Sequence, residues 1–205
     1  MNILGKITSI VAPAPGGNGG NGHGDHGDHH QGSDHQPSLS LSSLSRPPPL
    51  HSSGFPEQRI VELNLPVSAV APAAVANYRP VVITGNLAYV SGQIARDETG
   101  GVITGRMQTE SDVAAGVAGA RACAIATLSA LKGTLGDLNR VVRLVKASVF
   151  VNSSSDFTAH PKVADGFSDV MVEVFGESGK GARAAVGAIL PLQSVVEVES
   201  IWEVS

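Results

Sequence analysis

Hydrophobic and polar residues alternate with the period of a β-strand in several segments of this chain. Such runs predict a strand over residues 59–65, RIVELNL, and a hairpin over residues 81–95, VVITGNLAYVSGQIA, which turns at Gly85-Asn86. The β-branched run RVVRLVKASVFV, residues 140–151, predicts a longer strand.

Two other segments repeat their hydrophobic residues at helical spacing. The first covers residues 111–135, with Ser111 as the expected N-cap. Gly116 and Gly119 lower its helix propensity, so we expect them to allow close packing against the sheet. The second covers residues 160–175, with a proline in its first turn and a glycine after its end.

Two further strands are predicted over residues 182–189 and 195–204, with a proline turn between them. The order is β-β-β-α-β-α-β-β, which is typical of an α+β fold with one sheet and two helices. On the last strand, side chains alternate between a face of Val196, Val198, Ser200, Trp202 and Val204 and a face of Glu197, Glu199, Ile201 and Glu203. We expect the first face to pack on the helices. If the last two strands pair as neighbours, Arg183 and Glu197 lie together on the helix-free face.

The first part of the chain has a different composition. Residues 1–55 consist largely of Gly, His, Ser and Pro and cannot bury enough apolar surface to offset the entropy of ordering, so a disordered tail is predicted before a single domain over residues 56–205. Five of its six histidines, His23, His26, His29, His30 and His35, are interleaved with aspartates. They suggest loose metal chelation, or a low-complexity segment without an evolved ligand, which is the interpretation we favour.

Composition excludes several classes of function. The net charge of −4 argues against a nucleic-acid binder, which needs a basic face. The sequence contains no run of 18 or more apolar residues, so no membrane span is predicted. The single cysteine, Cys123, excludes a multi-cysteine metal site and lies in a helical pattern, where we expect a buried side chain. Residues 1–15 lack the features of a secretory signal, so a cytoplasmic location is expected, with organelle targeting left open.

Three segments carry a family resemblance. They are NYRPVVITGNLAYVSGQIA, DFTAHPKVADGFSDVMVEVFGE and GARAAVGAILPLQSVVEVESIWEV. Together they resemble the RidA/YjgF family of imine/enamine deaminases, and in particular its longer, chorismate-mutase-like branch. The resemblance runs from about residue 60 to residue 205. It implies a single mixed sheet with two helices packed on one face, and a homotrimer whose sites lie between subunits.

The resemblance also implies roles for individual residues. Arg183 would hold the substrate carboxylate and Glu197 would activate water, while Tyr78, Ser91 and Gly92 would line the pocket. The implied reaction converts 2-imino or enamine acids of the 2-aminoacrylate type into 2-keto acids and ammonia. It needs no metal and no organic cofactor, and its partners are a small carboxylate and further copies of the chain.

Two pocket positions depart from the pattern of the studied deaminases. Ala185 stands where they often carry a cysteine, and Asp165 falls where they carry an asparagine. These departures support an alternative, a non-catalytic trimer that binds small carboxylates as a sensor or regulator. Ribonuclease and mutase activities rank lower, because the chain is acidic and its key motif has one arginine.

The residue types suit this chemistry independently of the resemblance. An arginine fork matches a carboxylate in two parallel hydrogen bonds, and a shielded glutamate with a raised pKa is suited to be a general base. The plainer alternatives are a salt bridge from Arg183 to Glu197 or Glu199, and a solvated strand face. A Ser-His-Asp triad at Ser91 is not expected, because the folded part contains only His160.

Overall fold

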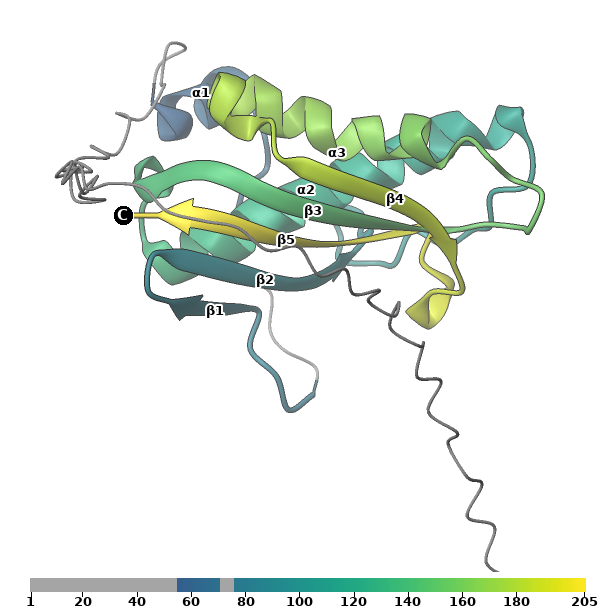
Figure 1. Cartoon of the computed structure of the whole chain (residues 1–205), viewed down its shortest axis with the longest axis horizontal. Coiled ribbons are helices and arrows are strands. Elements are labelled where there is room, and N and C mark those ends of the chain that lie inside the picture. The colour runs from purple at the N-terminus through teal and green to yellow at the C-terminus, as the bar shows by residue number, and fades with distance from the viewer. Residues whose placement is uncertain (1–54, 71–75) are drawn as a thin grey trace, which may run out of the picture. The chain divides into compact units, whose positions relative to one another are not determined.

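Five strands form a mixed sheet in the order β1-β2-β5-β3-β4 (Figure 1). The computed structural model describes residues 55–70 and 76–205, so the predicted tail up to residue 54 and its histidines lie outside the described residues. The strands are β1 Val81–Thr84, β2 Leu87–Ile94, β3 Val141–Asn152, β4 Ala182–Ala188 and β5 Val196–Val204. All neighbouring pairs are antiparallel except β3 and β4, which are parallel.

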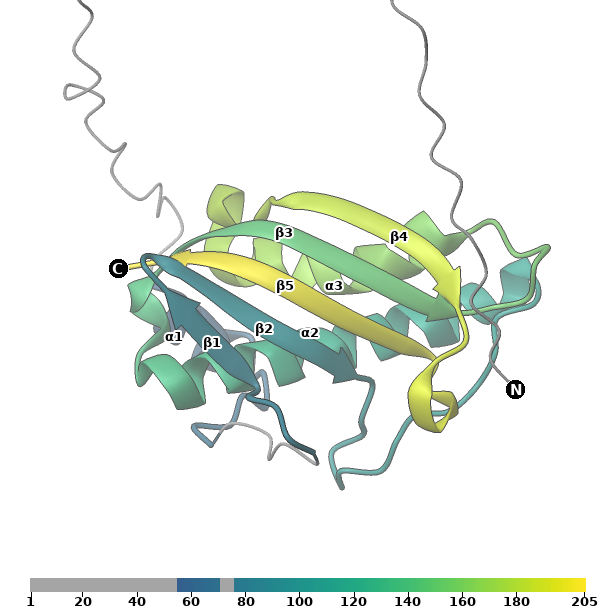
Figure 2. The ribbon, with the colours of Figure 1, turned by 60° about the horizontal axis from the view of Figure 1, so that its bottom comes forward.

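The two long helices, α2 (Val113–Leu135) and α3 (His160–Phe175), cover the same face of the sheet (Figure 2). α2 packs on β2 and β5, and α3 packs on β3 and β4. The alternation predicted for β5 is confirmed, because Val196, Val198 and Trp202 are fully buried under the helices. The other face of the sheet carries no helix among the described residues and is called the open face below.

Most of the predicted elements are confirmed. The hairpin turns at Gly85, whose φ of 57° is easily adopted by glycine. Gly119 packs against the sheet as expected, with Val195 where a Cβ would lie, whereas Gly116 packs against Val163 of α3. The N-cap of α2 lies one residue later than predicted, at Asp112 rather than Ser111, because a 3₁₀ turn over Glu110–Asp112 precedes the helix.

The predicted strand over residues 59–65 is wrong. This segment lies mostly in a short helix, α1 (Pro56–Glu62), which contacts α3 and makes no strand pairing. Ile60 and Leu65 are buried, and Arg59 pairs with Glu62 one turn later, at 2.6 Å. Pro56 at the first helical position favours the helix. Ile60 therefore belongs to the helix, and Leu65 to the loop that follows it.

The long apolar helix is a core element of this fold. Within the described residues, the segment Glu110–Leu135 is long and apolar enough to cross a membrane by length and composition alone. Half of its most apolar window is buried inside the protein, where it packs on the sheet.

The last two strands do not pair as neighbours. β3 lies between β4 and β5 and pairs with both, so that Val149 faces Ala185 on one side and Val198 on the other. All three of these residues turn toward the helices, since residues aligned across a sheet share a face. This order controls where the candidate site residues lie.

Candidate functional site

A β-bulge interrupts β2 at Ser91-Gly92. Val90 pairs with Ser200 and Gln93 with Val198, so the two bulge residues stand opposite the single residue Glu199. Val90 and Gln93 are both buried. Bulges re-aim side chains and occur often beside active sites.

The carboxyl group of Glu197 lies against this bulge. Its Oε1 is 2.0 Å from the position that a Cβ of residue 92 would take, so only glycine leaves room for it there. Burial raises the pKa of Glu197, and the negative charge of Glu199 raises it further. The site therefore contains a carboxyl group that holds its proton more firmly than an ordinary glutamate does.

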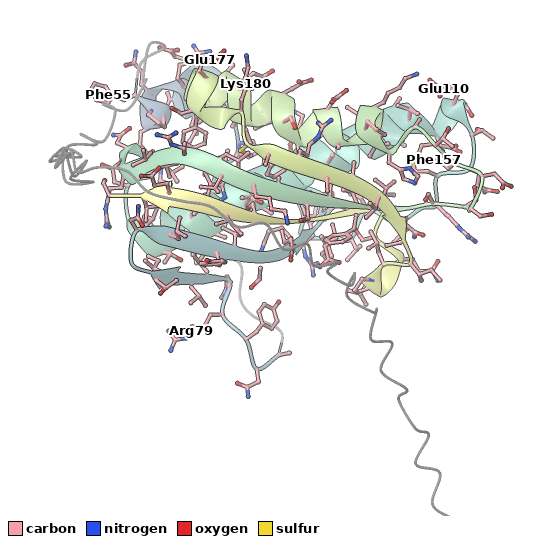
Figure 3. The ribbon with its side chains drawn as sticks, in the orientation of Figure 1. Phe55, Arg79, Glu110, Phe157, Glu177 and Lys180 are labelled. Atoms are coloured by element: carbon pink, nitrogen blue, oxygen red, sulfur yellow. The ribbon has the colours of Figure 1, made fainter. Side chains whose placement is uncertain are left out.

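A cleft of about 790 Å³ opens beside this glutamate. Four candidate residues from the sequence line this cleft: Tyr78, Ser91, Gly92 and Glu197. Glu199 lines it as well. Tyr78 is about half exposed, on the loop before β1. The hydroxyl of Ser91 donates a hydrogen bond of 2.7 Å to the carbonyl of the next loop residue, Arg79, labelled in Figure 3.

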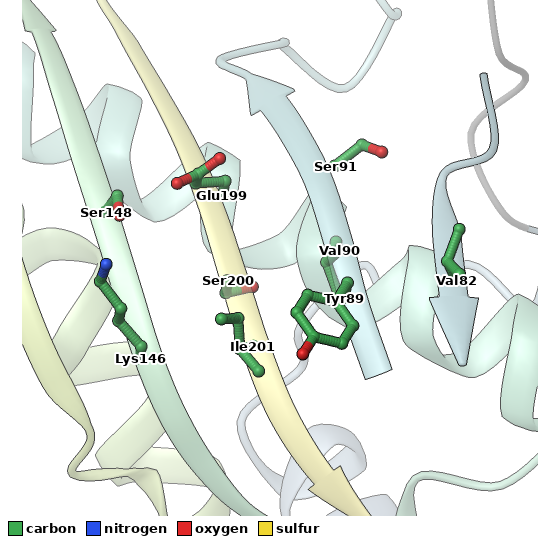
Figure 4. Close-up of a pocket in the computed structure, with 9 residues that line it drawn as sticks. All are labelled: Val82, Tyr89, Val90, Ser91, Lys146, Ser148, Glu199, Ser200 and Ile201. Carbon is green, nitrogen blue, oxygen red and sulfur yellow. The ribbon is translucent and has the colours of Figure 1, made fainter. Parts of the chain in front are cut away.

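A smaller hollow of about 270 Å³ adjoins the cleft on the open face and shares Ser91 and Glu199 with it (Figure 4). Lys146 of β3 and Tyr89 of β2 flank it, together with Ser148. Polar and apolar side chains are mixed here, on a surface that no helix of the described chain covers.

Arg183 lies on the opposite face of the sheet. Its guanidinium donates hydrogen bonds from Nη1 to Oδ1 of Asp165 and to Oγ of Ser168, each at 2.9 Å, and both partners are on α3. Nη2 reaches the carbonyl of Pro161 at 3.4 Å, at the start of the same helix. The side chain of Arg183 thus extends from the edge strand β4 to α3.

The expectation that Arg183 and Glu197 share the helix-free face is therefore wrong. Arg183 is aligned with Ala147, which is buried under the helices, whereas Glu197 is aligned with Phe150, whose position in β3 turns to the open face. Their partners in the intervening strand β3, Ala147 and Phe150, are three residues apart. Because side chains alternate along a strand, an odd separation places Arg183 and Glu197 on opposite faces. Within one chain, the alternative salt bridge from Arg183 to Glu197 or Glu199 is wrong for the same reason, since the partner of Arg183 is Asp165.

The candidate residues thus form two groups. Tyr78, Ser91, Gly92 and Glu197 belong to the cleft, while Asp165 and Ala185 accompany Arg183 on the helix side. Ala185 is half-buried and packs on the hydrophobic core. Ser168 was not among the site residues expected from the sequence, although its spacing of three residues from Asp165 places both on one side of α3.

Other reactive side chains have structural partners. His160 begins α3, as expected; its Nε2 is 3.0 Å from Oγ of Ser153, and its ring packs edge-on against Phe157. Cys123 is buried, as predicted, and burial raises the pKa of its thiol. Among residues 55–70 and 76–205, no three His, Cys, Asp or Glu side chains gather as a metal would require.

Comparison with known proteins identifies relatives of this chain. Residues 57–204 match the family model of YjgF/chorismate mutase-like, putative endoribonuclease proteins. The chain is 46% identical over 145 residues to Protein TCP17 of Trypanosoma cruzi, covering 70% of this chain and 89% of that protein. It is 33% identical over 134 residues to a 2-iminobutanoate/2-iminopropanoate deaminase of Dermatophagoides farinae, covering 64% and 89%.

Solved structures agree with this relationship. Protein Atu1372 of Agrobacterium tumefaciens, a protein of unknown function, aligns with a TM-score of 0.66 at 38% identity, covering 74% of this chain and 94% of the other. A putative endoribonuclease of Shewanella oneidensis aligns with a TM-score of 0.68 at 29% identity, covering 74% and 100%.

Proposed function

Because the chain belongs to the YjgF/chorismate-mutase-like family, we propose that it is a hydrolytic deaminase of reactive 2-imino acids and their enamine tautomers. The substrates are of the 2-aminoacrylate type and the products are 2-keto acids and ammonia. The mite relative named as such a deaminase supports this reaction class. The observation that carries the proposal is the carboxyl group of Glu197, which has a raised pKa and lies against Gly92 in an open cleft.

The proposed mechanism uses Glu197 as a general base and then as an acid. Its carboxylate takes a proton from water while the oxygen of that water adds to C2 of the imine, and the electrons of the C=N bond move to nitrogen, which takes up a proton from solvent. The protonated Glu197 then gives its proton to the nitrogen of the carbinolamine and ammonia leaves. The C=O bond forms as the carbinolamine hydroxyl releases its proton to solvent. General acid–base assistance of this kind typically contributes on the order of 10²–10⁴-fold.

Arg183 supplies the carboxylate grip in this proposal, but it comes from a neighbouring copy of the chain. A site in which one chain brings Arg183 to its own Glu197 is excluded by the fold, because the sheet separates them. The proposal therefore depends on assembly, and we propose the homotrimer that the family resemblance implies. Exposed apolar residues support contact between copies on the open face, where Val82, Tyr89 and Val186 are each more than 40% exposed.

A second candidate function is non-catalytic binding of small carboxylates. Ala185 and Asp165 favour it, because they stand where the studied deaminases carry a cysteine and an asparagine. Saturable binding of a 2-keto acid without any hydrolysis of the imino acid would identify this function. Ribonuclease activity has less support, since the two glutamates that line the cleft, Glu197 and Glu199, would repel a phosphate backbone.

The experiment is a trapping assay on the full chain. An amino-acid oxidase generates 2-iminobutanoate in the presence of semicarbazide, and a deaminase slows semicarbazone formation because it consumes the imine first. Arg183→Ala should abolish this effect while the assembly and the folded structure persist. The matched control is Arg121→Ala, which removes an arginine from an exposed pair with Glu173. Unchanged activity in Arg183→Ala, or a wild-type protein that is monomeric, would refute the proposal.

A further inference from the structure

The cleft that contains Glu197 also contains a second arginine. Arg96 lines this cleft and is exposed, just beyond the end of β2. Among the described residues it makes no ion pair with a carboxylate, although seven other arginine and lysine side chains do.

The position of Arg96 follows from the strand. Ile94 is the cross-strand partner of Glu197, and Arg96 lies two residues further on, past the buried Ala95. Alternation therefore turns Arg96 to the same face as Ile94 and Glu197. Diagonal neighbours of this kind have Cα atoms roughly 7–8 Å apart, a distance that long side chains can bridge.

The guanidinium is fixed by the turn that follows it. Nη1 of Arg96 donates a hydrogen bond of 2.7 Å to the carbonyl of Gly100. That turn is tied together by Oδ1 of Asp97, which accepts hydrogen bonds from the Thr99 and Gly101 amides, each at 2.9 Å. A hydrogen bond from the Thr99 hydroxyl, together with the Gly101 and Thr99 amides, lowers the pKa of Asp97, so the aspartate at this turn stays charged. Arg96 is held in place while the other donors of its fork have no partner among the described residues.

We propose that Arg96 binds a second carboxylate, so that the preferred substrates of the deaminase are 2-imino dicarboxylic acids. The inference rests on the proposed function: Arg183 of a neighbouring copy holds the carboxylate next to the imine, Glu197 acts on the imine carbon, and Arg96 holds the carboxylate at the far end. Both side chains line one cleft, so a four- or five-carbon diacid can present its imine carbon to Glu197 and its far carboxylate to Arg96. A planar guanidinium can hold a carboxylate in two parallel hydrogen bonds.

The test compares two imino acids on the full-length protein. D-aspartate oxidase generates 2-iminoglutarate from D-glutamate, and a D-amino-acid oxidase generates 2-iminobutanoate from D-2-aminobutyrate. The wild-type protein should prefer the diacid in kcat/KM, and Arg96→Gln should raise the KM of the diacid by roughly tenfold or more. The KM of the monoacid should change less than twofold. Arg96→Lys, which keeps the charge without the fork, should give an intermediate KM for the diacid.

Arg106→Gln is the matched control, because Arg106 bonds to the carbonyl of Ser153 and does not line the cleft. An equal loss for both substrates in Arg96→Gln, or no preference for the diacid in the wild type, would overturn the inference. If the wild type hydrolyses neither imino acid, the proposed function fails. Calorimetry with 2-oxoglutarate and 2-oxobutanoate then decides on Arg96 alone: tighter binding of the diacid that Arg96→Gln removes supports the anion site, and no such difference refutes it.

Discussion

The carboxylate of Glu197 lies directly over Gly92, so closely that a Cβ at residue 92 would stand 2.0 Å from Oε1. The contact is with the far end of a flexible side chain, and the added methyl of Gly92→Ala would push the carboxylate aside. We expect this variant to fold normally and to lose about 10–100-fold in kcat, since small misplacements of a catalytic group are costly. Steady-state kinetics and a thermal melt measure both quantities.

Gly119→Ala provides the contrast for this prediction. Its new methyl would meet the buried side chain of Val195 at 2.4 Å, in the core rather than in the cleft. Overpacking of this kind typically costs about 1–3 kcal/mol of stability. We expect a lowered Tm with little change in kcat for the folded protein. A Gly92→Ala protein with unaltered kcat would remove Glu197 from the mechanism.

The second prediction concerns pH. Burial and the charge of Glu199 raise the pKa of Glu197, so its basic form is lost at a higher pH than for an ordinary glutamate. We expect kcat/KM to fall as the pH drops through this raised pKa. Glu199→Gln removes the repelling charge and should move the acid limb of the profile to lower pH. An acid limb that does not move in Glu199→Gln would show that Glu199 does not tune the base.

The same pKa shift has an effect on stability with a definite sign. The folded protein binds the proton of Glu197 more firmly than the unfolded chain does, so the free energy of unfolding decreases as the pH rises from the ordinary glutamate pKa through the raised one. Glu197→Gln removes this cost. At neutral pH we expect its Tm to equal or exceed that of the wild type although turnover is lost, and a clearly lower Tm would contradict the argument.

The ion pair between Arg183 and Asp165 leads to a third prediction. The Asp165 carboxylate occupies the guanidinium that a substrate carboxylate would need, with Nη1 and Oδ1 at 2.9 Å. Asp165→Asn keeps the shape and removes the competing charge. Because the pair is partly exposed, we expect only modestly tighter binding: the Kd of 2-oxobutanoate, measured by calorimetry, should fall by about two- to fivefold.

Asp169→Asn is the control for this variant. It makes the same change of charge one turn further along α3, at an exposed residue with no hydrogen bond to Arg183. Its affinity for the keto acid should match that of the wild type. Weaker binding in Asp165→Asn would show that Asp165 positions the arginine rather than competes for it.

The fourth prediction tests whether two copies share a site. Arg183→Ala and Glu197→Gln should each be inactive alone, because every site lacks one partner. Unfolding and refolding the two variants together as an equal mixture should restore roughly a quarter of the wild-type activity, if copies join at random in a closed symmetric assembly. A mixture that stays inactive, although mass spectrometry shows mixed assemblies, would contradict a shared site.

The sequence predicted the periods of the strands better than their neighbours. Alternation along β5 correctly separated Val198 from Glu197, because the side-chain period of a strand is a local property. The neighbour of β4 is not local. The short turn at Pro191 left pairing of β4 with β5 open, but the chain crosses β3 there, and the sequence of β4 gives no sign of this crossing.

Two other features could not be predicted from the sequence, because they depend on contacts between distant segments. The bulge at Ser91-Gly92 depends on the pairing partner, so the run LAYVSGQI alone shows only a strand. The segment 59–65 has apolar residues that suit either a strand or a helix, and its contact with α3 decides for the helix. Short apolar runs remain ambiguous until their tertiary contacts are known.

The placement of Arg183 and Glu197 on opposite faces has a consequence for symmetry. A two-fold dimer joins a patch to its own copy, so it would have to bring both faces of the sheet into one contact. A head-to-tail contact joins one face to the other, and it completes a site at every junction only when the ring closes. Two copies joined head to tail would form one complete site, and one Arg183 and one Glu197 would be left without a partner copy. Dilution that opens the ring would then lower the activity per chain before any chain unfolds.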